Sequence, residues 1–112
     1  TAHLGIRTML VEPGAFRTHF YDDSLRQADT KISDYDVIAD WYRKDCMESR
    51  HDQPGDPEKG GEIIVDTVLG DNPPLRLLLG SDAVKAAEEV LKQRWEEVEN
   101  WKHVSQKSDY DV

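Results

Sequence analysis

Residues 5–14, GIRTMLVEPG, constrain the fold of this chain more than any other segment. Met9, Leu10 and Val11 are consecutive apolar residues without the polar alternation that a half-exposed strand shows. Strands of this kind lie inside parallel sheets, where helices cover both faces. The segment therefore predicts a buried parallel strand, and Pro13-Gly14 predicts a sharp turn at its end.

The rest of the chain predicts one further strand and three helices. The spacing of Ile38, Trp41 and Cys46 indicates a helix, and Asp56 followed by Pro57 is a typical helix start. Residues 20–35 lack a clear period and predict a loop or short helical turns. The expected elements after the first strand are helix 36–50, a helix from Pro57 to a stop at Gly70, strand 75–79, and helix 82–102 with Ser81 as its cap.

Two apolar stripes should be buried in the last two helices. One contains Ile63, Ile64, Val68 and Leu69, and the other contains Val84, Ala87, Leu91, Trp95, Val98 and Trp101. The pair Gly60-Gly61 weakens the first of these helices, so it implies either close packing or a soft first turn.

This order of elements is that of a right-handed crossover between two parallel strands. Two such strands do not form a sheet that can stand alone, because the first leaves a long apolar edge unpaired. The chain also begins at Thr1 and not at methionine. We therefore expect a fragment of a larger α/β domain, which packs against sequence that it does not contain.

Composition excludes several classes of function. Lysine and arginine number 14 against 23 acidic residues, a net charge of −9, which disfavours nucleic-acid binding. Cys46 is the only cysteine, the four histidines are scattered, and no apolar run is long enough to span a bilayer. We expect no metal site and no membrane partner, and a cytoplasmic location.

The loop from Pro13 to Thr18 has the residue types of a ligand site. It follows the carboxyl end of the predicted strand, where doubly wound folds bind their ligands. Gly14 allows the backbone to approach a flat ligand, and the next amides become free to bond it. The Thr18 hydroxyl adds a donor for an amide carbonyl or a phosphate oxygen.

The segment GIRTMLVEPGAFRT resembles the sixth strand and PGxxxT loop of short-chain dehydrogenases/reductases. Downstream, GDPEKGGEIIVDTV and PPLRLLLGSDA are similar to the next helix and the seventh strand of that family. The resemblance implies the C-terminal part of a Rossmann-type doubly wound parallel sheet. It also implies that Pro13 and Gly14 shape the nicotinamide loop of NAD or NADP, that the Phe16 backbone bonds the carboxamide, and that Thr18 reaches the carboxamide or the pyrophosphate.

The resemblance divides the fragment, residues 1–112, into four sections. Residues 1–19 are the strand and nicotinamide loop, 20–55 the substrate lid, 56–80 a helix and the last strand, and 81–112 the terminal helix and tail. In the lid section, Trp41 and Tyr42 either line a substrate pocket or pack onto the sheet. His19 either faces substrate or is a solvated loop residue. Trp95 and Trp101 pack either in the core or against a second subunit.

Other family motifs are absent from these 112 residues. No TGxxxGxG turn is present, and no tyrosine stands four residues before a lysine. The chain therefore has no catalytic residue of the family, and we expect it neither to bind the cofactor nor to transfer hydride by itself. In the full-length form the resemblance implies a small carbonyl or alcohol substrate. Two alternatives are a non-catalytic interaction module that pairs as a homo-oligomer through residues 75–101, and an unrelated small α/β binding protein.

Overall fold

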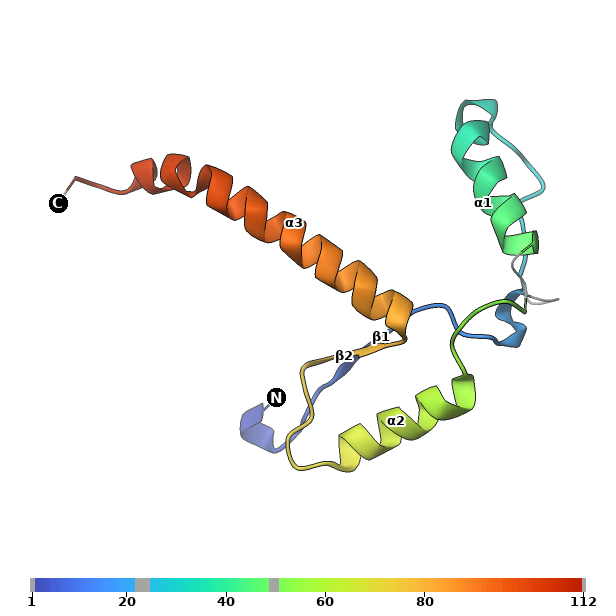
Figure 1. Cartoon of the computed structure of the whole chain (residues 1–112), viewed down its shortest axis with the longest axis horizontal. Coiled ribbons are helices and arrows are strands. Elements are labelled where there is room, and N and C mark those ends of the chain that lie inside the picture. Colours follow the sequence, from blue (N-terminus) through green and yellow to red (C-terminus); the bar gives the residue numbers. More distant parts are fainter. Residues whose placement is uncertain (1, 22–24, 49–50, 112) are drawn as a thin grey trace.

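The structure is a computed structural model that describes residues 2–21, 25–48 and 51–111. Two strands and three α-helices follow the predicted order (Figure 1). Short 3₁₀ turns occupy Ala2–Leu4, His19–Tyr21, Ser33–Tyr35 and Gln106–Ser108. The main elements are β1 (Leu10–Pro13), α1 (Asp36–Glu48), α2 (Pro57–Leu69), β2 (Arg76–Leu79) and α3 (Ser81–Ser105).

The two strands pair in parallel, as the sequence predicts. Leu10 lies opposite Arg76 and Pro13 lies opposite Leu79, so both strands end at the same edge. The backbone N–H of Gly14 extends the ladder by donating to the Leu79 carbonyl over 2.8 Å. The loop after β1 therefore begins beside the turn that leads from β2 into α3.

Helix α2 starts where the sequence indicates. The Asp56 carboxylate accepts hydrogen bonds from the backbone N–H groups of Glu58 and Lys59, and Pro57 is the first helical residue. The helix ends at Gly70, whose backbone N–H donates a hydrogen bond to the Thr67 carbonyl. Gly70 has an ordinary negative φ of −70°, so a left-handed conformation is not what stops the helix there.

The predicted cap of α3 is wrong. Gly80 is the N-cap and Ser81 is the first helical residue, and no side chain makes a capping hydrogen bond there. Gly80 has a φ of +101°, a region that favours glycine because a Cβ would be strained. The change of direction from β2 into α3 thus depends on the glycine, not on the serine hydroxyl.

The predicted burial of β1 and of the helix stripes is also not found within this chain. Leu10 is 46% exposed, and Leu69 in α2 and Trp95 in α3 are 77% and 65% exposed. Within the described ranges β1 pairs with β2 alone, so no second strand covers its other edge. These surfaces have the apolar character of a core but lack an opposing layer.

The dimensions of the molecule agree with this open packing. Its radius of gyration is 20.4 Å, whereas a compact chain of this length has about 13 Å. Its accessible surface is 10046 Å², against roughly 6,300 Å² for a compact monomer of this mass. Cys46 and Leu79 are the only large or sulfur-containing apolar side chains among the described residues that are buried.

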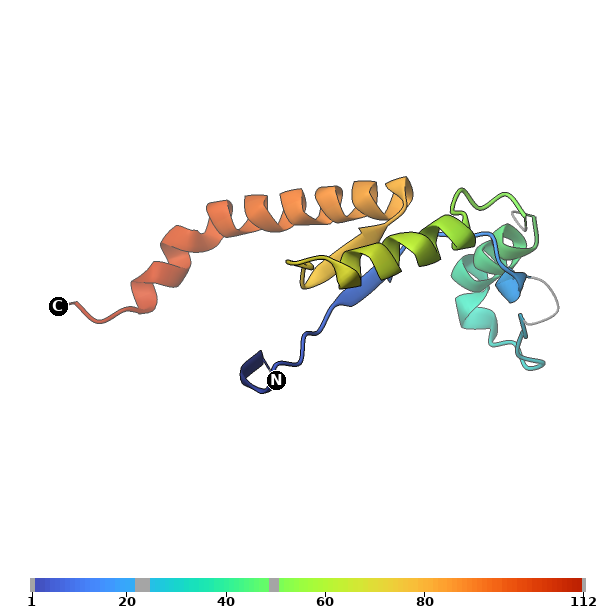
Figure 2. The ribbon, with the colours of Figure 1, turned by 90° about the horizontal axis from the view of Figure 1, so that it is seen from below.

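The helices leave the strand pair in different directions. α2 lies along one side of β1 and β2, whereas α3 projects away from the end of β2 (Figures 1 and 2). α1 stands apart, beyond the loop that follows β1. None of the helices in the described ranges has the length and apolar content that a membrane span requires.

Candidate functional site

The loop that follows β1 is held at its start by two residues from the β2–α3 turn. The Gly14 N–H donates to the Leu79 carbonyl, and the Ala15 N–H donates to Oδ2 of Asp82 over 2.7 Å. Asp82 lies in the first turn of α3. Consequently, the first two amides of the loop are both occupied by protein acceptors.

The middle of the loop pairs with the segment before α2. Gly55 donates its N–H to the Ala15 carbonyl over 2.9 Å, and its own carbonyl accepts the Arg17 N–H over 2.8 Å. Phe16 therefore lies opposite Gly55 in a single parallel bridge. In this geometry the N–H between the two bonded positions points away from the partner segment. The Phe16 N–H has no acceptor among the residues that the structure describes.

Two side chains fix the loop after Phe16. The Arg17 guanidinium donates through Nε and Nη2 to the Gln53 carbonyl, at 3.2 and 3.0 Å. The Thr18 hydroxyl oxygen accepts the Phe20 N–H over 3.2 Å, which leaves its own O–H proton available to a ligand. The loop is thus fixed before and after the Phe16 amide, which remains open in the described structure.

The Phe16 ring lies against two glycines. A Cβ built on Gly55 would be 2.7 Å from Phe16 Cγ, and one built on Gly60 would be 2.7 Å from Phe16 Cε1. Gly60 is buried, whereas a Cβ on Gly61 would meet no atom within 4 Å. The close packing implied by the glycine pair therefore applies to Gly60 alone.

Asp82 fits between two further glycines. Its Oδ1 would be 2.1 Å from a Cβ on Gly14 and 2.6 Å from one on Gly80. The Ala15 N–H is the main cause that lowers the pKa of Asp82, and burial opposes it. The carboxylate is therefore ionised at neutral pH, at a helix N-terminus where negative charge is favoured.

A mostly apolar pocket of about 440 Å³ opens beside this loop. It lies between the ends of the strands, the loop and the first turns of α2, and Phe20 and Tyr21 border it. All four residues predicted to contact a cofactor line it: Pro13, Gly14, Phe16 and Thr18. Its mostly apolar lining with a few polar groups is typical of a small-molecule site.

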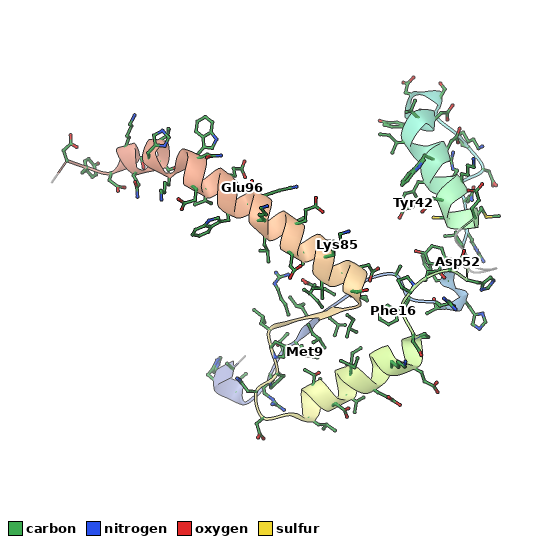
Figure 3. The ribbon with its side chains drawn as sticks, viewed as in Figure 1. Met9, Phe16, Tyr42, Asp52, Lys85 and Glu96 are labelled. Carbon is green, nitrogen blue, oxygen red and sulfur yellow. The ribbon has the colours of Figure 1, made fainter. Side chains whose placement is uncertain are left out.

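His19, Trp41 and Tyr42, the residues predicted to face substrate, do not line this pocket. His19 borders a separate hollow with Thr18 and His51, and Tyr42 borders another, of about 210 Å³, with Cys46. Trp41 is 65% exposed, with its ring centroid 6.4 Å from that of Tyr42. Neither aromatic residue packs onto the sheet, because α1 stands away from the strands (Figure 3).

Metal binding finds no support in the described part of the chain. No three His, Cys, Asp or Glu side chains there are grouped so that they could hold an ion. The features that support the predicted role of the loop are its backbone donors, its glycines and the apolar pocket.

Sequence reasoning missed the residues that hold the loop in place. The sequence pattern predicts Asp82 only as the first residue of the last helix, although an acidic residue in the first helical turn is a recognisable signal. Gly55 and Gly60 gave no indication of which aromatic ring they would meet. Their role depends on contacts between segments about 40 residues apart, which local pattern does not reveal.

Comparison with known proteins agrees with this geometry. The structure superposes on a short-chain dehydrogenase from Streptomyces avermitilis with a TM-score of 0.75 and 32% sequence identity, covering 96% of this chain and 38% of that protein. The chain matches the C-terminal portion of a short-chain dehydrogenase/reductase. The two parallel strands and their helices are thus part of a Rossmann-type fold, as the sequence predicts.

A second similarity comes from a fungal protein. Over 104 residues, which are 93% of this chain, it is 29% identical to oxidoreductase BOA17 of Botryotinia fuckeliana. It spans 38% of the length of that relative, the same share as for the Streptomyces dehydrogenase. No family model matches the sequence.

Proposed function

We propose that this chain supplies the nicotinamide end of the cofactor site in an NAD(P)-dependent oxidoreductase that acts on a carbonyl or alcohol. The observation that carries the proposal is the Phe16 amide. It is the one N–H between Gly14 and Arg17 that has no protein acceptor in the described structure, and Phe16 lines an apolar pocket. A carboxamide oxygen on a flat ring is a matching acceptor.

The neighbouring residues fit the same ligand. Gly14 and Pro13 border the pocket without a long side chain, which leaves room for a ring to approach the backbone. The Thr18 hydroxyl proton is available at the pocket edge for a carboxamide or pyrophosphate oxygen. When bound, the nicotinamide ring supplies the hydride chemistry. The role of these residues is to bind and orient that ring.

The other functions of such an enzyme lie outside these 112 residues. The phosphates need a glycine-rich turn, and proton exchange with substrate needs a tyrosine and lysine pair, and this sequence has neither. The chain by itself is therefore expected to be inactive and to show no measurable cofactor binding. Trp41 and Tyr42 are proposed to border substrate only when further sequence positions α1, and His19 is proposed to border it from the 3₁₀ turn after the loop.

A fluorescence titration tests the proposal. NADH and NADPH titrated into this chain should give no saturable signal. Both cofactors should be compared on the product of the reading frame extended upstream of Thr1, which should contain TGxxxGxG and YxxxK and bind one of them. An extended frame that encodes neither motif would contradict the enzyme assignment.

A matched pair of variants tests the Phe16 amide in that extended product. Phe16→Pro removes the N–H, whereas Phe16→Ala keeps it, and both lose the ring contacts with Gly55 and Gly60. The proline variant should bind the cofactor about 3- to 10-fold more weakly than the alanine variant, the effect of one hydrogen bond. Equal affinities of the two variants would show that the Phe16 N–H does not bind the cofactor.

A second candidate function is that of a homo-oligomeric interaction module. The exposed apolar face of α3 favours it, because Leu91, Trp95 and Trp101 are 68%, 65% and 62% exposed. A second copy would bury these side chains. Size-exclusion chromatography with light scattering should then show a defined oligomer, and a monomer or polydisperse aggregate would count against it.

A further inference from the structure

We propose that Asp82 is the positioning residue of the nicotinamide loop. Its carboxylate, carried by the first turn of α3, holds the Ala15 amide and, together with the pairing of the loop with Gly55, fixes the direction of the open Phe16 amide. The contact itself stands independently of any ligand. Its consequence for cofactor binding rests on the function proposed above.

The contact between Asp82 and the loop joins parts of the chain that are far apart in sequence. Oδ2 accepts the Ala15 N–H over 2.7 Å across a separation of 67 residues. Oδ1 is buried, has no hydrogen-bond partner among the described residues, and lies beside Gly14 and Gly80. One carboxylate thus bonds the loop and also occupies the space where side chains at positions 14 and 80 would lie.

The backbone of Gly14 shows that the carboxylate is the obstacle to a side chain there. Among the described glycines only Gly5 and Gly80 have a positive φ, so position 14 has a conformation that other residues adopt. The three atoms nearest to a Cβ on Gly14 all belong to Asp82. A methyl group at position 14 would therefore displace the carboxylate and break its bond to Ala15.

The hydrogen bonds around Phe16 explain how this contact reaches the ligand site. Asp82 holds the Ala15 N–H on one side. Gly55 holds the loop on the other, through the Ala15 carbonyl, which shares a peptide plane with the Phe16 N–H, and through the Arg17 N–H. With both neighbouring amides bonded to protein, the Phe16 peptide has little freedom to rotate. Loss of the Asp82 contact would release one of these two fixed points.

A simpler role for Asp82 must be distinguished from this one. Any acidic residue in the first turn of a helix stabilises that helix through its dipole. If Asp82 did only this, a carboxylate at the adjacent position would serve equally well. The variant Ser81→Asp/Asp82→Asn provides that comparison, because it keeps the charge in the first turn and removes the bond to Ala15.

Amide exchange measured by NMR on ¹⁵N-alanine-labelled chain tests the proposal. The label reports Ala15 in the loop, Ala83, Ala86 and Ala87 in α3, and Ala39 in α1 as a distant reference. In Asp82→Asn the exchange of the Ala15 amide should be at least about tenfold faster, because the bond to a charged acceptor is lost. In Ser81→Asp/Asp82→Asn the α3 alanines should regain their protection and Ala15 should not.

A double-mutant cycle with Gly14→Ala sharpens the test. Gly14→Ala and Asp82→Ala should each accelerate Ala15 exchange, and the double variant should show no more than the larger single effect. Any of three outcomes would overturn the proposal. The two single effects could multiply in the double variant, Ala15 exchange could be unchanged in Asp82→Asn, or Ser81→Asp could restore the protection of Ala15. None of these outcomes depends on NADH binding, so failure here is distinct from failure of the proposed function.

Discussion

The loop around Phe16 and the helix α3 differ in whether this chain supplies the partners that each needs. The loop is bonded by Leu79, Asp82 and Gly55, all within this chain. α3 has regular backbone hydrogen bonds, but its apolar face is open. The difference teaches that backbone geometry of the ligand loop is encoded within these residues, whereas burial of the helices requires a further surface.

Substitutions on the open face of α3 should have the largest effect. Trp95→Gln with Trp101→Gln removes two large exposed rings, and central tryptophans of an interface typically contribute at least about 2 kcal/mol each. If the chain is the interaction module proposed as the second candidate function, its self-association should weaken by roughly 30-fold or more for each substitution, as measured by sedimentation equilibrium. Glu89→Gln, on the opposite face of α3, is the control and should change little. An unchanged association constant in the tryptophan variant would show that α3 is not the contact.

Substitution of the two adjacent glycines of α2 separates the loop contact from helix propensity. Gly60→Ala places a methyl group into the Phe16 ring, and overpacking of this kind costs about 1–3 kcal/mol. The Arg17 and Gly55 amides should exchange faster. Gly61→Ala meets no atom within 4 Å and should stabilise α2 by up to about 1 kcal/mol, seen as higher helicity by circular dichroism. Similar behaviour of both variants would contradict the packing described here.

Removal of the N-cap of α2 should lower the stability by a smaller amount, and only the start of that helix should be affected. Asp56→Ala removes the acceptor for the Glu58 and Lys59 amides, at a cost of about 1 kcal/mol. Amide exchange should accelerate in the first turn of α2 while α3 is unaffected. Asp66→Ala, in the same helix but away from its start, serves as the comparison, and equal losses in both would argue against a specific cap.

Titration of Asp82 gives the finest test of the loop. The Ala15 N–H lowers the pKa of Asp82 below its ordinary value of 3.8, so the contact is fully present above that pH. It is lost as the pH falls through the lowered value. The Ala15 amide shift in an NMR titration should follow a transition whose midpoint lies below 3.8, and Asp82→Asn should abolish that transition. A midpoint above 3.8 would contradict the assignment.

The order of elements and the loop position were predictable because their signals are local. Three consecutive apolar residues before Pro13-Gly14 indicate a strand and its turn, and Asp56-Pro57 indicates a helix start. The resemblance carried by the Pro13–Thr18 motif led to the family, which the structural comparison supports. The roles of the four loop residues remain predictions, although all four line one pocket.

Other features could not be predicted from local sequence. Burial of Ile63 or Leu91 depends on what lies opposite, and periodicity reports only which face is apolar. The cap of α3 was misassigned because a serine before a helix is a common cap, whereas here the positive φ at Gly80 is what the turn requires. The contact of Asp82 with Ala15 can be recognised only once the three-dimensional positions of β1 and β2 are known.

The separation of 67 residues between Ala15 and Asp82 has a consequence for the biosynthesis of this protein. The ribosome makes the loop long before it makes the carboxylate that holds it, and domains fold as their parts become available during synthesis. The Ala15 amide must therefore wait until β2 and the first turn of α3 have left the ribosome. The loop around Phe16 therefore acquires its final form only after the first turn of α3 has been made, although its own residues are translated 67 positions earlier.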